Sequence, residues 1–435
     1  MPGYRTMARE KDTIDCLICH ARAYDMNRKQ VVKDGNGLMR WEQDRSLRAA
    51  LSVGRTTAQT CLRCHQHNFG GDVYVDEQDP SYMESLRSTG RERPRVLHPG
   101  SKRGTPYSPS WDVHAAAGLA CTECHTTEGH FIAKGQHTTT MMANDLPDVA
   151  VACEKCHEAA PHSSLGAEGA ALDRHTAKVA CQTCHVPSLQ ADNVTMRDFS
   201  VATFEETAGI YVYSDIAKET EAGKGIRYAW WNCDGTFLGG PIGDNPNGAG
   251  LYTSYPVQHR WPEFASYDYR AWYERVMRPI SRKKPSKLYA FKLYNGRQHI
   301  DLANIGPFGG MFVPYNLPTY YTSGDPLKAG RRELEKPMMG MMYGFMFKHY
   351  LMDKFMTFMG VEGWDTSVYD DVKAGRGVEP RWIPTDALME ISHAIRKTGA
   401  LSCSSCHGPS GVLDWRALGY RESEIAALSG QKTVS

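Results

Sequence analysis

The sequence lacks a long apolar run and an excess of charge of either sign. No stretch reaches the roughly 18 apolar residues that a membrane helix needs. The most apolar stretch, residues 337–360, carries Lys348, His349, Asp353 and Lys354 and predicts a methionine-rich core helix instead. The 50 Lys and Arg residues nearly balance the 49 Asp and Glu residues, for a formal net charge of +1. This composition predicts neither a transmembrane segment nor a basic surface for nucleic acid.

Cysteine is scarce outside one repeated pattern. The pattern C-x-x-C-H occurs six times and contains all but one of the 13 cysteines. The six copies are Cys16/Cys19/His20, Cys61/Cys64/His65, Cys121/Cys124/His125, Cys153/Cys156/His157, Cys181/Cys184/His185 and Cys403/Cys406/His407. The remaining cysteine, Cys233, is expected to be a small buried core residue.

This pattern has the chemistry of covalent c-type haem attachment. Two thiols at this spacing can form thioether bonds to the porphyrin edge, and the histidine that follows can bind the iron from one side. Zinc ribbons and redox dithiols also use C-x-x-C pairs, but neither needs a histidine directly after the second cysteine. The sequence therefore predicts six covalently bound haem c groups, with the six motif histidines as proximal iron ligands.

Further histidines stand at regular positions around the motifs and are candidates for the opposite, distal side of each iron. The predicted distal ligands are His98, His114, His130, His162, His175 and His393. His130 and His162 each follow the histidine of their own motif by five residues. In a helix such a residue has risen only about 7.5 Å, so both are expected to reach a neighbouring haem. The five histidines that belong to neither group are expected to lie at the surface or to contact propionates or substrate: His67, His137, His259, His299 and His349.

The motif density predicts three sections. Residues 1–190 hold five motifs and should form a pentahaem core of short helices and loops wrapped on porphyrin. Residues 191–382 are haem-free, aromatic and rich in glycine, and predict a section of low regular structure packed on the core. Residues 383–435 predict a C-terminal helical segment with the sixth haem. The expected fold is a mainly α, loop-rich multihaem cytochrome c with a haem-packed core.

Local patterns predict individual elements within these sections. A helix is expected around residues 41–53, a surface loop over 72–95 and a strand at 287–294, where apolar residues alternate. A final helix is expected from Thr385, a good N-cap residue, to Gly399. His393 would lie on that helix opposite its apolar stripe.

Several longer matches indicate a family. The carrying segments are Ile14-Asp-Cys-Leu-Ile-Cys-His20, Trp111-Asp-Val-His114, Gly118-Leu-Ala-Cys121, Thr127-Glu-Gly-His130, Pro161-His162, the stretch from His175 to Pro187, Lys287-Leu-Tyr-Ala-Phe-Lys292, Ile391-Ser-His393, and Cys403 to Tyr420. Together they resemble the octahaem tetrathionate reductases, multihaem cytochromes of the periplasm. The resemblance begins just before the third haem of that family and spans nearly the whole chain.

The resemblance implies two further haems in the family that this chain does not encode. One of them is the catalytic haem, whose iron is held by a lysine while substrate approaches from the other side. The lysine of the family follows the motif that matches Cys16–His20, so Lys29 is the candidate for this catalytic ligand, with Lys33 as the less favoured substitute. Met1 is accordingly expected to be an internal or misassigned start, or the two haems to come from another chain.

Two functions compete. The resemblance implies part of a periplasmic reductase of small sulfur or nitrogen compounds such as tetrathionate, nitrite or hydroxylamine. The alternative is a pure electron conduit, in which every iron has two histidines and no substrate binds. A haem-stabilised structural or sensor protein has little in its favour, because six haems exceed what sensing needs.

Expected partners are quinol-linked proteins or small cytochromes. Haem attachment outside the cytoplasm predicts a periplasmic or other extracytoplasmic protein, although residues 1–7 form no apolar signal.

Overall fold

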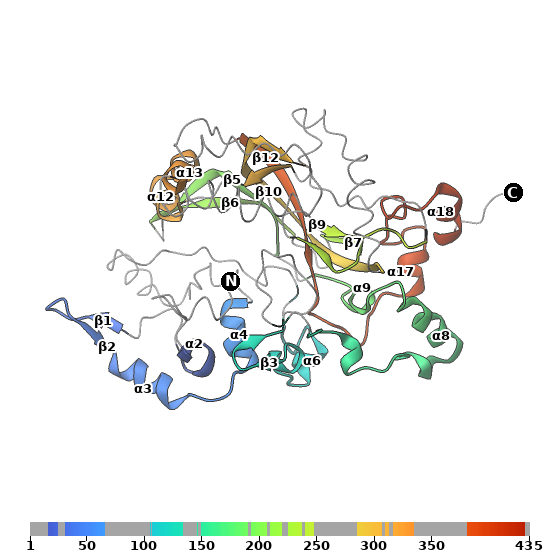
Figure 1. Ribbon diagram of the computed structural model, residues 1–435, viewed down its shortest axis with the longest axis horizontal. Coiled ribbons are helices and arrows are strands. Elements are labelled where there is room, and N and C mark those ends of the chain that lie inside the picture. Colours follow the sequence, from blue (N-terminus) through green and yellow to red (C-terminus); the bar gives the residue numbers. More distant parts are fainter. Residues whose placement is uncertain are drawn as a thin grey trace. The chain divides into compact units, whose positions relative to one another are not determined.

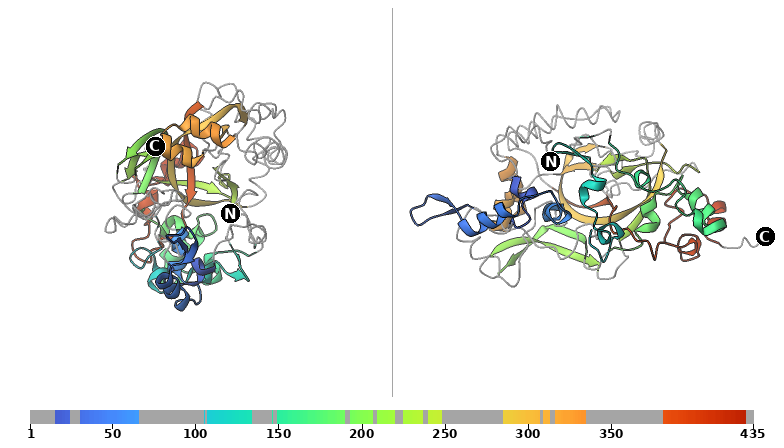
Figure 2. Two further views of the ribbon diagram at one scale, coloured as in Figure 1. Left: turned by 90° about the vertical axis from the view of Figure 1, so that its left-hand side faces the viewer. Right: turned by 90° about the horizontal axis from the view of Figure 1, so that it is seen from below.

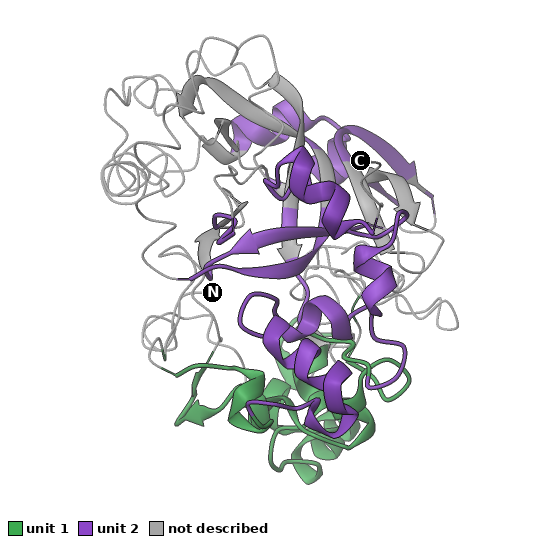
Figure 3. Ribbon diagram, turned by 90° about the vertical axis from the view of Figure 1, so that its right-hand side faces the viewer, with its two compact units in different colours: residues 1–158, 393–396 green, residues 159–392, 397–435 purple. Residues whose placement is uncertain are grey.

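The structure is a computed structural model. It describes residues 16–24, 31–65, 105, 107–133, 146, 149–189, 193–206, 209–219, 225–236, 240–247, 285–306, 309–312, 316–334 and 381–430. Backbone contacts divide the chain into unit 1, residues 1–158 with 393–396, and unit 2, residues 159–392 with 397–435 (Figure 3). The expected section boundaries at 190 and 382 rest on motif density and stay a prediction. The expected loop at 72–95 and helix at 337–360 lie outside the described residues.

In its described part, unit 1 consists of short helices, loops and two small hairpins (Figure 1). Its helices are α2 (Cys16–His20), α3 (Gln43–Leu51), α4 (Ala58–His65), α6 (Val113–Ala116), α7 (Cys121–Cys124) and the 3-10 turn η2 (Cys153–Lys155). Its strands are β1 (Val31–Lys33) with β2 (Met39–Trp41), and β3 (Thr127–Glu128) with β4 (Phe131–Ile132). The expected helix at 41–53 is confirmed by α3, which Glu42 caps by accepting a hydrogen bond from the Arg45 amide at 2.7 Å.

Helical turns carry the C-x-x-C-H motifs. Helices α2 and α7 and the turn η2 begin at the first cysteine of a motif, as do α9 (Cys181–His185) and α17 (Cys403–His407) in unit 2. Residues three and four apart lie on one side of a helical turn. The second cysteine and the histidine of each motif are therefore brought next to the first cysteine by local structure alone.

Unit 2 is built around a six-stranded sheet (Figures 1 and 2). Its central strand, β10 (Lys287–Gly306), is 20 residues long and pairs along its length with β7, β12, β5 and β11. The other strands of unit 2 are β5 (Asn193–Glu205), β6 (Ile210–Glu219), β7 (Ile226–Trp231), β8 (Asp234–Thr236), β9 (Gly240–Ile242), β11 (Gly309–Phe312) and β12 (Arg381–Glu390). Its remaining helices are η3 (Ser163–Leu165), α8 (Gly166–His175), α12 (Leu317–Ser323), α13 (Pro326–Leu334) and α18 (Glu422–Leu428).

The sheet corrects two expectations. The strand expected at 287–294 is confirmed as part of β10. The described residues between 191 and 382 do not have the expected low regular structure, because they supply most of the sheet. In the described part of the chain, this sheet stands beside the short helices that the mainly α prediction expected. The helix expected over 385–399 is wrong: residues 381–390 form β12, which pairs antiparallel with 291–300 of β10. Ten residues of cross-strand pairing outweigh a helix propensity that differs by less than about 1 kcal/mol per residue between most residue types.

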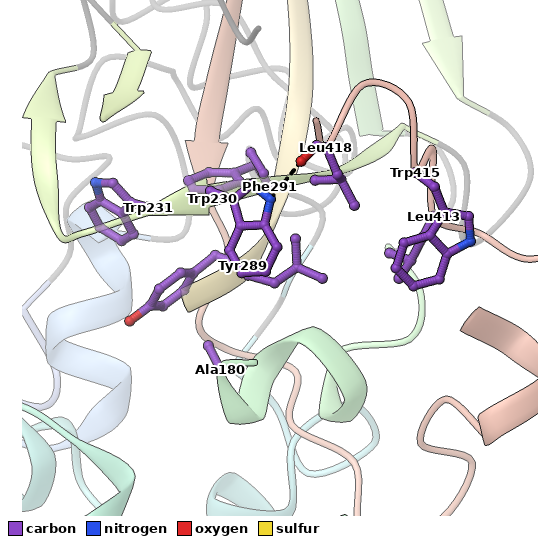
Figure 4. Close-up of a cluster of buried hydrophobic side chains, with 10 residues drawn as sticks. Ala180, Trp230, Trp231, Tyr289, Phe291, Leu413, Trp415 and Leu418 are labelled. Carbon is purple, nitrogen blue, oxygen red and sulfur yellow. Dashed lines mark hydrogen bonds between the residues drawn. The ribbon is translucent and has the colours of Figure 1, made fainter. Parts of the chain in front are cut away.

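A buried aromatic cluster joins this sheet to the C-terminal segment. Trp230 of β7 and Leu288 and Phe291 of β10 pack with Trp415 and Leu418 of the C-terminal segment (Figure 4). The indole Nε1 of Trp230 donates a hydrogen bond to the Leu418 carbonyl at 2.9 Å, which joins β7 to the C-terminal segment.

The α9 motif is held to the same strand by three hydrogen bonds. The Leu288 carbonyl accepts from the Thr183 hydroxyl at 2.6 Å and from the Ala180 amide at 2.9 Å. The Leu288 amide donates to the Lys178 carbonyl at 2.8 Å. The sheet is therefore a support for the motif at Cys181–His185.

Replacing Trp230 by Phe should lower the free energy of unfolding by about 1–3 kcal/mol, because the buried Leu418 carbonyl loses its donor. The matched control is Trp41→Phe, since Trp41 is 62% exposed; its effect should stay within about 0.5 kcal/mol. Guanidinium unfolding followed by far-UV circular dichroism measures both. Equal effects of the two variants would contradict the role given to the Trp230 hydrogen bond.

Candidate haem-binding site

Among the described residues, ten histidines form five pairs of facing rings. The ring centroids lie 6.1 Å apart in four pairs, His20–His130, His114–His157, His162–His185 and His175–His407, and 6.5 Å apart in His125–His393. Two imidazoles that bind one metal from opposite sides, each at about 2.0 Å, hold their centroids about 6 Å apart. The five spacings therefore match the distance that one iron between each pair requires.

Each pair joins one motif histidine to one predicted distal histidine of another segment. His130 faces His20 of the first motif, and His162 faces His185 of the fifth, so both meet a motif other than their own, as expected. The same holds for His114, His175 and His393, which face histidines of the fourth, sixth and third motifs. A metal in each position would tie two stretches of chain together.

Hydrogen bonds at Nδ1 fix the orientation of several of these rings. Four rings bond through Nδ1 to backbone carbonyls: His20 to Gly54 at 3.1 Å, His125 to Ala133 at 2.9 Å, His175 to Ala171 at 2.8 Å and His407 to Leu428 at 2.9 Å. A carbonyl can only accept, so the proton of a neutral ring must sit on Nδ1. The other nitrogen, Nε2, is then left with the lone pair that a metal needs.

Two distal candidates have a carboxyl group as neighbour instead. The Nδ1 atom of His162 lies 2.8 Å from Oδ1 of Asp173, and the same oxygen accepts the His162 backbone amide at 3.1 Å. The Nδ1 atom of His114 lies 3.3 Å from Oδ1 of Asp112. A carboxylate that accepts from a ligand histidine orients the ring and raises its basicity.

Asp112 also holds the segment of His393 in place. The Asp112 side chain is 1% exposed; Oδ1 caps α6 by accepting from the His114 and Ala115 amides, and Oδ2 accepts from the Ile395 amide at 2.9 Å. The Val113 amide in turn donates to the Ile395 carbonyl at 3.0 Å. One buried side chain thus connects the segments of two distal candidates.

His393 lies in this irregular segment and not on the helix that the sequence predicted. The neighbouring Ala394 has a φ of 64°, a left-handed conformation that no α-helix contains. The His393 ring meets the edge of Tyr107 at a centroid distance of 5.7 Å, and the Arg396 guanidinium lies 4.5 Å from the ring centre of Trp111. Burial, reinforced by Asp112, raises the pKa of Tyr107 to about 12, so its hydroxyl stays neutral and donates to the Leu119 carbonyl at 2.7 Å.

Cysteines of different motifs come together within each unit. In unit 1 the Cys61 and Cys121 thiols are hydrogen-bonded to each other, which lowers the pKa of Cys61 to about 7 and raises that of Cys121. In unit 2 burial raises the pKa of Cys184, which also lies near Cys403. Among the described residues, no group of three or more His, Cys, Asp and Glu side chains could hold a metal ion.

Protein side chains leave several of the described motif cysteines exposed: Cys16, Cys19, Cys124, Cys153, Cys156 and Cys403.

Cys19 and Cys156 show the physical reason. Helix α2, which contains Cys19, and the turn η2, which Cys156 caps, bury none of their residues. A single turn is too short to form the apolar stripe with which longer helices pack on a protein core. Protein side chains therefore leave these two sulfur atoms accessible, and their thioether bonds to haem stay a prediction.

This donor set fits haem c. Helical turns present the paired thiols, and facing imidazoles supply two nitrogen ligands on opposite sides of one position. Cys233 takes no part: its Sγ lies 3.4 Å from the Tyr289 hydroxyl beside the aromatic cluster. The side chains of Cys64, His65, Lys33 and His299 lie outside the described part, although Lys33 ends β1 and His299 lies in β10. The remaining candidates lie outside the described residues altogether: Lys29, His98, His67, His137, His259 and His349.

Sequence reasoning missed the residues that orient the ligands. Asp112 stands two residues before His114, a spacing that could have identified it as an N-cap beside a ligand. Asp173 stands 11 residues after His162, and no local pattern links the two. Trp415, whose ring stacks on His407 at 5.3 Å, carries no signal beyond its aromatic character.

Comparisons with known proteins give distant similarities. No protein-family model matches the chain. An uncharacterized protein of Archaeoglobus fulgidus is 27% identical over 140 residues, which cover 30% of this chain and 41% of that protein. The match thus spans about two fifths of that relative. A solved structure, the octaheme cytochrome c from Shewanella oneidensis, aligns with 95% of this chain and 77% of its own at a TM-score of 0.49 and 23% identity. Membership of the octahaem tetrathionate reductase family stays a prediction.

Within the described ranges, none of the helices combines the length and the apolar character that crossing a bilayer requires.

Replacing Asp112 by Ala should destabilise the 393–396 segment, because the Ile395 amide and two α6 amides lose their acceptor. A lost cap and an orphaned buried donor together should cost about 2–4 kcal/mol. Native-state hydrogen exchange at the Ile395 amide reports the change. Asp414→Ala is the control, because Asp414 accepts an exposed Ala417 amide and should cost about 1 kcal/mol or less. Unchanged protection at Ile395 would contradict the connection.

Proposed function

We propose that this chain is a multihaem c-type cytochrome that carries electrons through six covalently bound haems, each iron held between two histidines. The observation that carries the proposal is the set of five imidazole pairs at 6.1–6.5 Å, each with one motif histidine. Six C-x-x-C-H motifs in one chain are hard to explain by any other ligand.

The roles follow from this geometry. The paired thiols attach the porphyrin, the motif histidine binds one face, and a histidine of another segment binds the opposite face. When bound, each haem supplies a one-electron couple between Fe(III) and Fe(II). At His20, His125, His175 and His407 the carbonyls at Nδ1 keep the ring in the tautomer whose Nε2 has a lone pair for iron. By elimination we assign His98 to the second motif, opposite His65.

A reductase role needs an iron with an open or weakly held position, and each of the five described pairs supplies two histidines. We therefore favour the electron conduit for these five haems. Reduction of tetrathionate, nitrite or hydroxylamine, with Lys29 as a catalytic ligand, stays a prediction that rests on the family resemblance. The same holds for a periplasmic location and for quinol-linked or small cytochrome partners.

Loading of all motifs is the first test. Protein produced in a host that matures c-type cytochromes should exceed the 48.6 kDa polypeptide by the mass of six haems. Intact mass spectrometry measures the gain, and a pyridine haemochrome spectrum identifies the haem as c-type. Bound zinc, or a gain of fewer than six haems, would contradict the proposal.

Ligation is the second test. The reduced wild-type protein should bind no carbon monoxide at the haems whose irons have two histidines. His130→Ala should open one of them, so that one haem becomes high-spin when oxidised and binds carbon monoxide when reduced. His137→Ala, at a histidine predicted to bind no iron, is the control and should leave both spectra unchanged. Carbon monoxide binding to several wild-type haems, together with nitrite or hydroxylamine turnover, would favour the reductase.

A further inference from the structure

The pair His162–His185 differs from the other four described pairs in two respects. Its ring planes are nearly parallel, at 8°, whereas the other pairs are inclined by 56–80°. One of its histidines also donates to a carboxylate at hydrogen-bonding distance, from Nδ1 of His162 to Asp173 at 2.8 Å.

The fold fixes this contact from several sides. Asp173 lies on α8, and its Oδ1 accepts both the amide and the ring N–H of His162. Helix α8 can approach so closely because residue 169 is glycine: a Cβ atom there would lie 1.8 Å from the His162 carbonyl oxygen. The side chains of His162 and Asp173 are only 24% and 15% exposed, so water screens their interaction weakly.

The carboxylate of Asp112 is less suited to the same task. Its Oδ1 lies 3.3 Å from Nδ1 of His114, and three backbone amides already donate to its two oxygens. The carboxyl oxygens of Asp112 are therefore occupied mainly by hydrogen bonds from backbone amides. Asp173 has no such bond in the described contacts beyond the one from His162 itself.

We propose that Asp173 is a positioning residue that lowers the reduction potential of the haem between His162 and His185. The proposal rests on the proposed function. By accepting the Nδ1 proton in a strong hydrogen bond, the carboxylate makes His162 a more basic ligand, which stabilises Fe(III) relative to Fe(II). The negative charge acts in the same direction, because it opposes the arrival of an electron.

The redox step is the transfer of one electron. One electron passes from a neighbouring reduced haem of the chain to Fe(III), which becomes Fe(II) while the donor is oxidised by one electron. No covalent bond forms or breaks in this step. The closeness of Cys184 to Cys403 and Cys406 makes the motif at Cys403–His407 a described candidate for this neighbour.

The ring geometry provides a way to distinguish this haem from those of the other four described pairs. Low-spin ferric haems with near-parallel axial imidazoles give a rhombic electron paramagnetic resonance signal, whereas steeply inclined imidazoles give a highly anisotropic one. Among the five described pairs, only His162–His185 should be rhombic. Titrating that signal with dithionite under potential control gives the midpoint of this haem.

The decisive variant is Asp173→Asn in the holoprotein, which can keep a hydrogen-bond acceptor and loses the charge. The Fe(II) to Fe(III) ratio of the rhombic haem at a fixed potential should rise about tenfold, a positive shift of about 59 mV for one electron. Asp173→Glu, which keeps the carboxylate, should restore most of the wild-type midpoint. Glu168→Gln is the matched control, because Glu168 is an exposed carboxylate on the same helix; it should leave the midpoint unchanged.

An unchanged midpoint in Asp173→Asn, or an equal shift in Glu168→Gln, would overturn the assignment. If Asp173→Asn loses the rhombic signal, its midpoint cannot be measured and Asp173→Glu becomes the test. An Asp173→Glu protein that keeps the rhombic signal and the wild-type midpoint supports Asp173 as a positioning residue, and any other result overturns that assignment. Six low-spin haems without a rhombic signal would overturn the inference and leave the electron-transfer function intact. A wild-type protein without low-spin haems would instead contradict the proposed function.

Discussion

The architecture depends on one constraint: two imidazoles that bind one metal ion must lie on opposite sides of it, with their ring centroids about 6 Å apart. A helical turn can supply one of them next to the paired thiols, but no turn can place a second ring on the opposite side. Every described pair accordingly draws its second histidine from another segment, such as His393 for His125. The segments that carry the described pairs are therefore connected to one another through these histidines, and the helices among them are short.

Facing rings also need the right nitrogen, and neighbouring groups decide which one is available. Backbone carbonyls at Gly54, Ala133, Ala171 and Leu428 meet Nδ1 of their histidines without adding charge. At His162 the group that meets Nδ1 is the carboxyl group of Asp173. The structure thus surrounds chemically similar histidine pairs with different neighbours, and such neighbours orient a histidine ring and tune its basicity as a ligand.

The sheet of unit 2 has a supporting role. Strand β10 pairs with four others, and its Leu288 holds the α9 motif through both backbone groups. Trp230 and Trp415 join the same strands to the C-terminal motif segment, where Trp415 stacks on His407. A rigid sheet beside loop-borne ligands limits how far the ligands can move, because packed aromatic side chains tolerate little displacement.

The sequence by itself determined the local chemistry: six thiol pairs with adjacent histidines, a set of candidate partners, and elements such as α3 and the start of β10. These follow from spacings of a few residues, where helical and extended geometry leave little choice. Only the tertiary structure decided which histidine faces which motif, that residues 381–390 form a strand instead of a helix, and that Asp173 meets His162. Those outcomes depend on contacts between distant segments, whose energies exceed the small local preferences that a sequence pattern records.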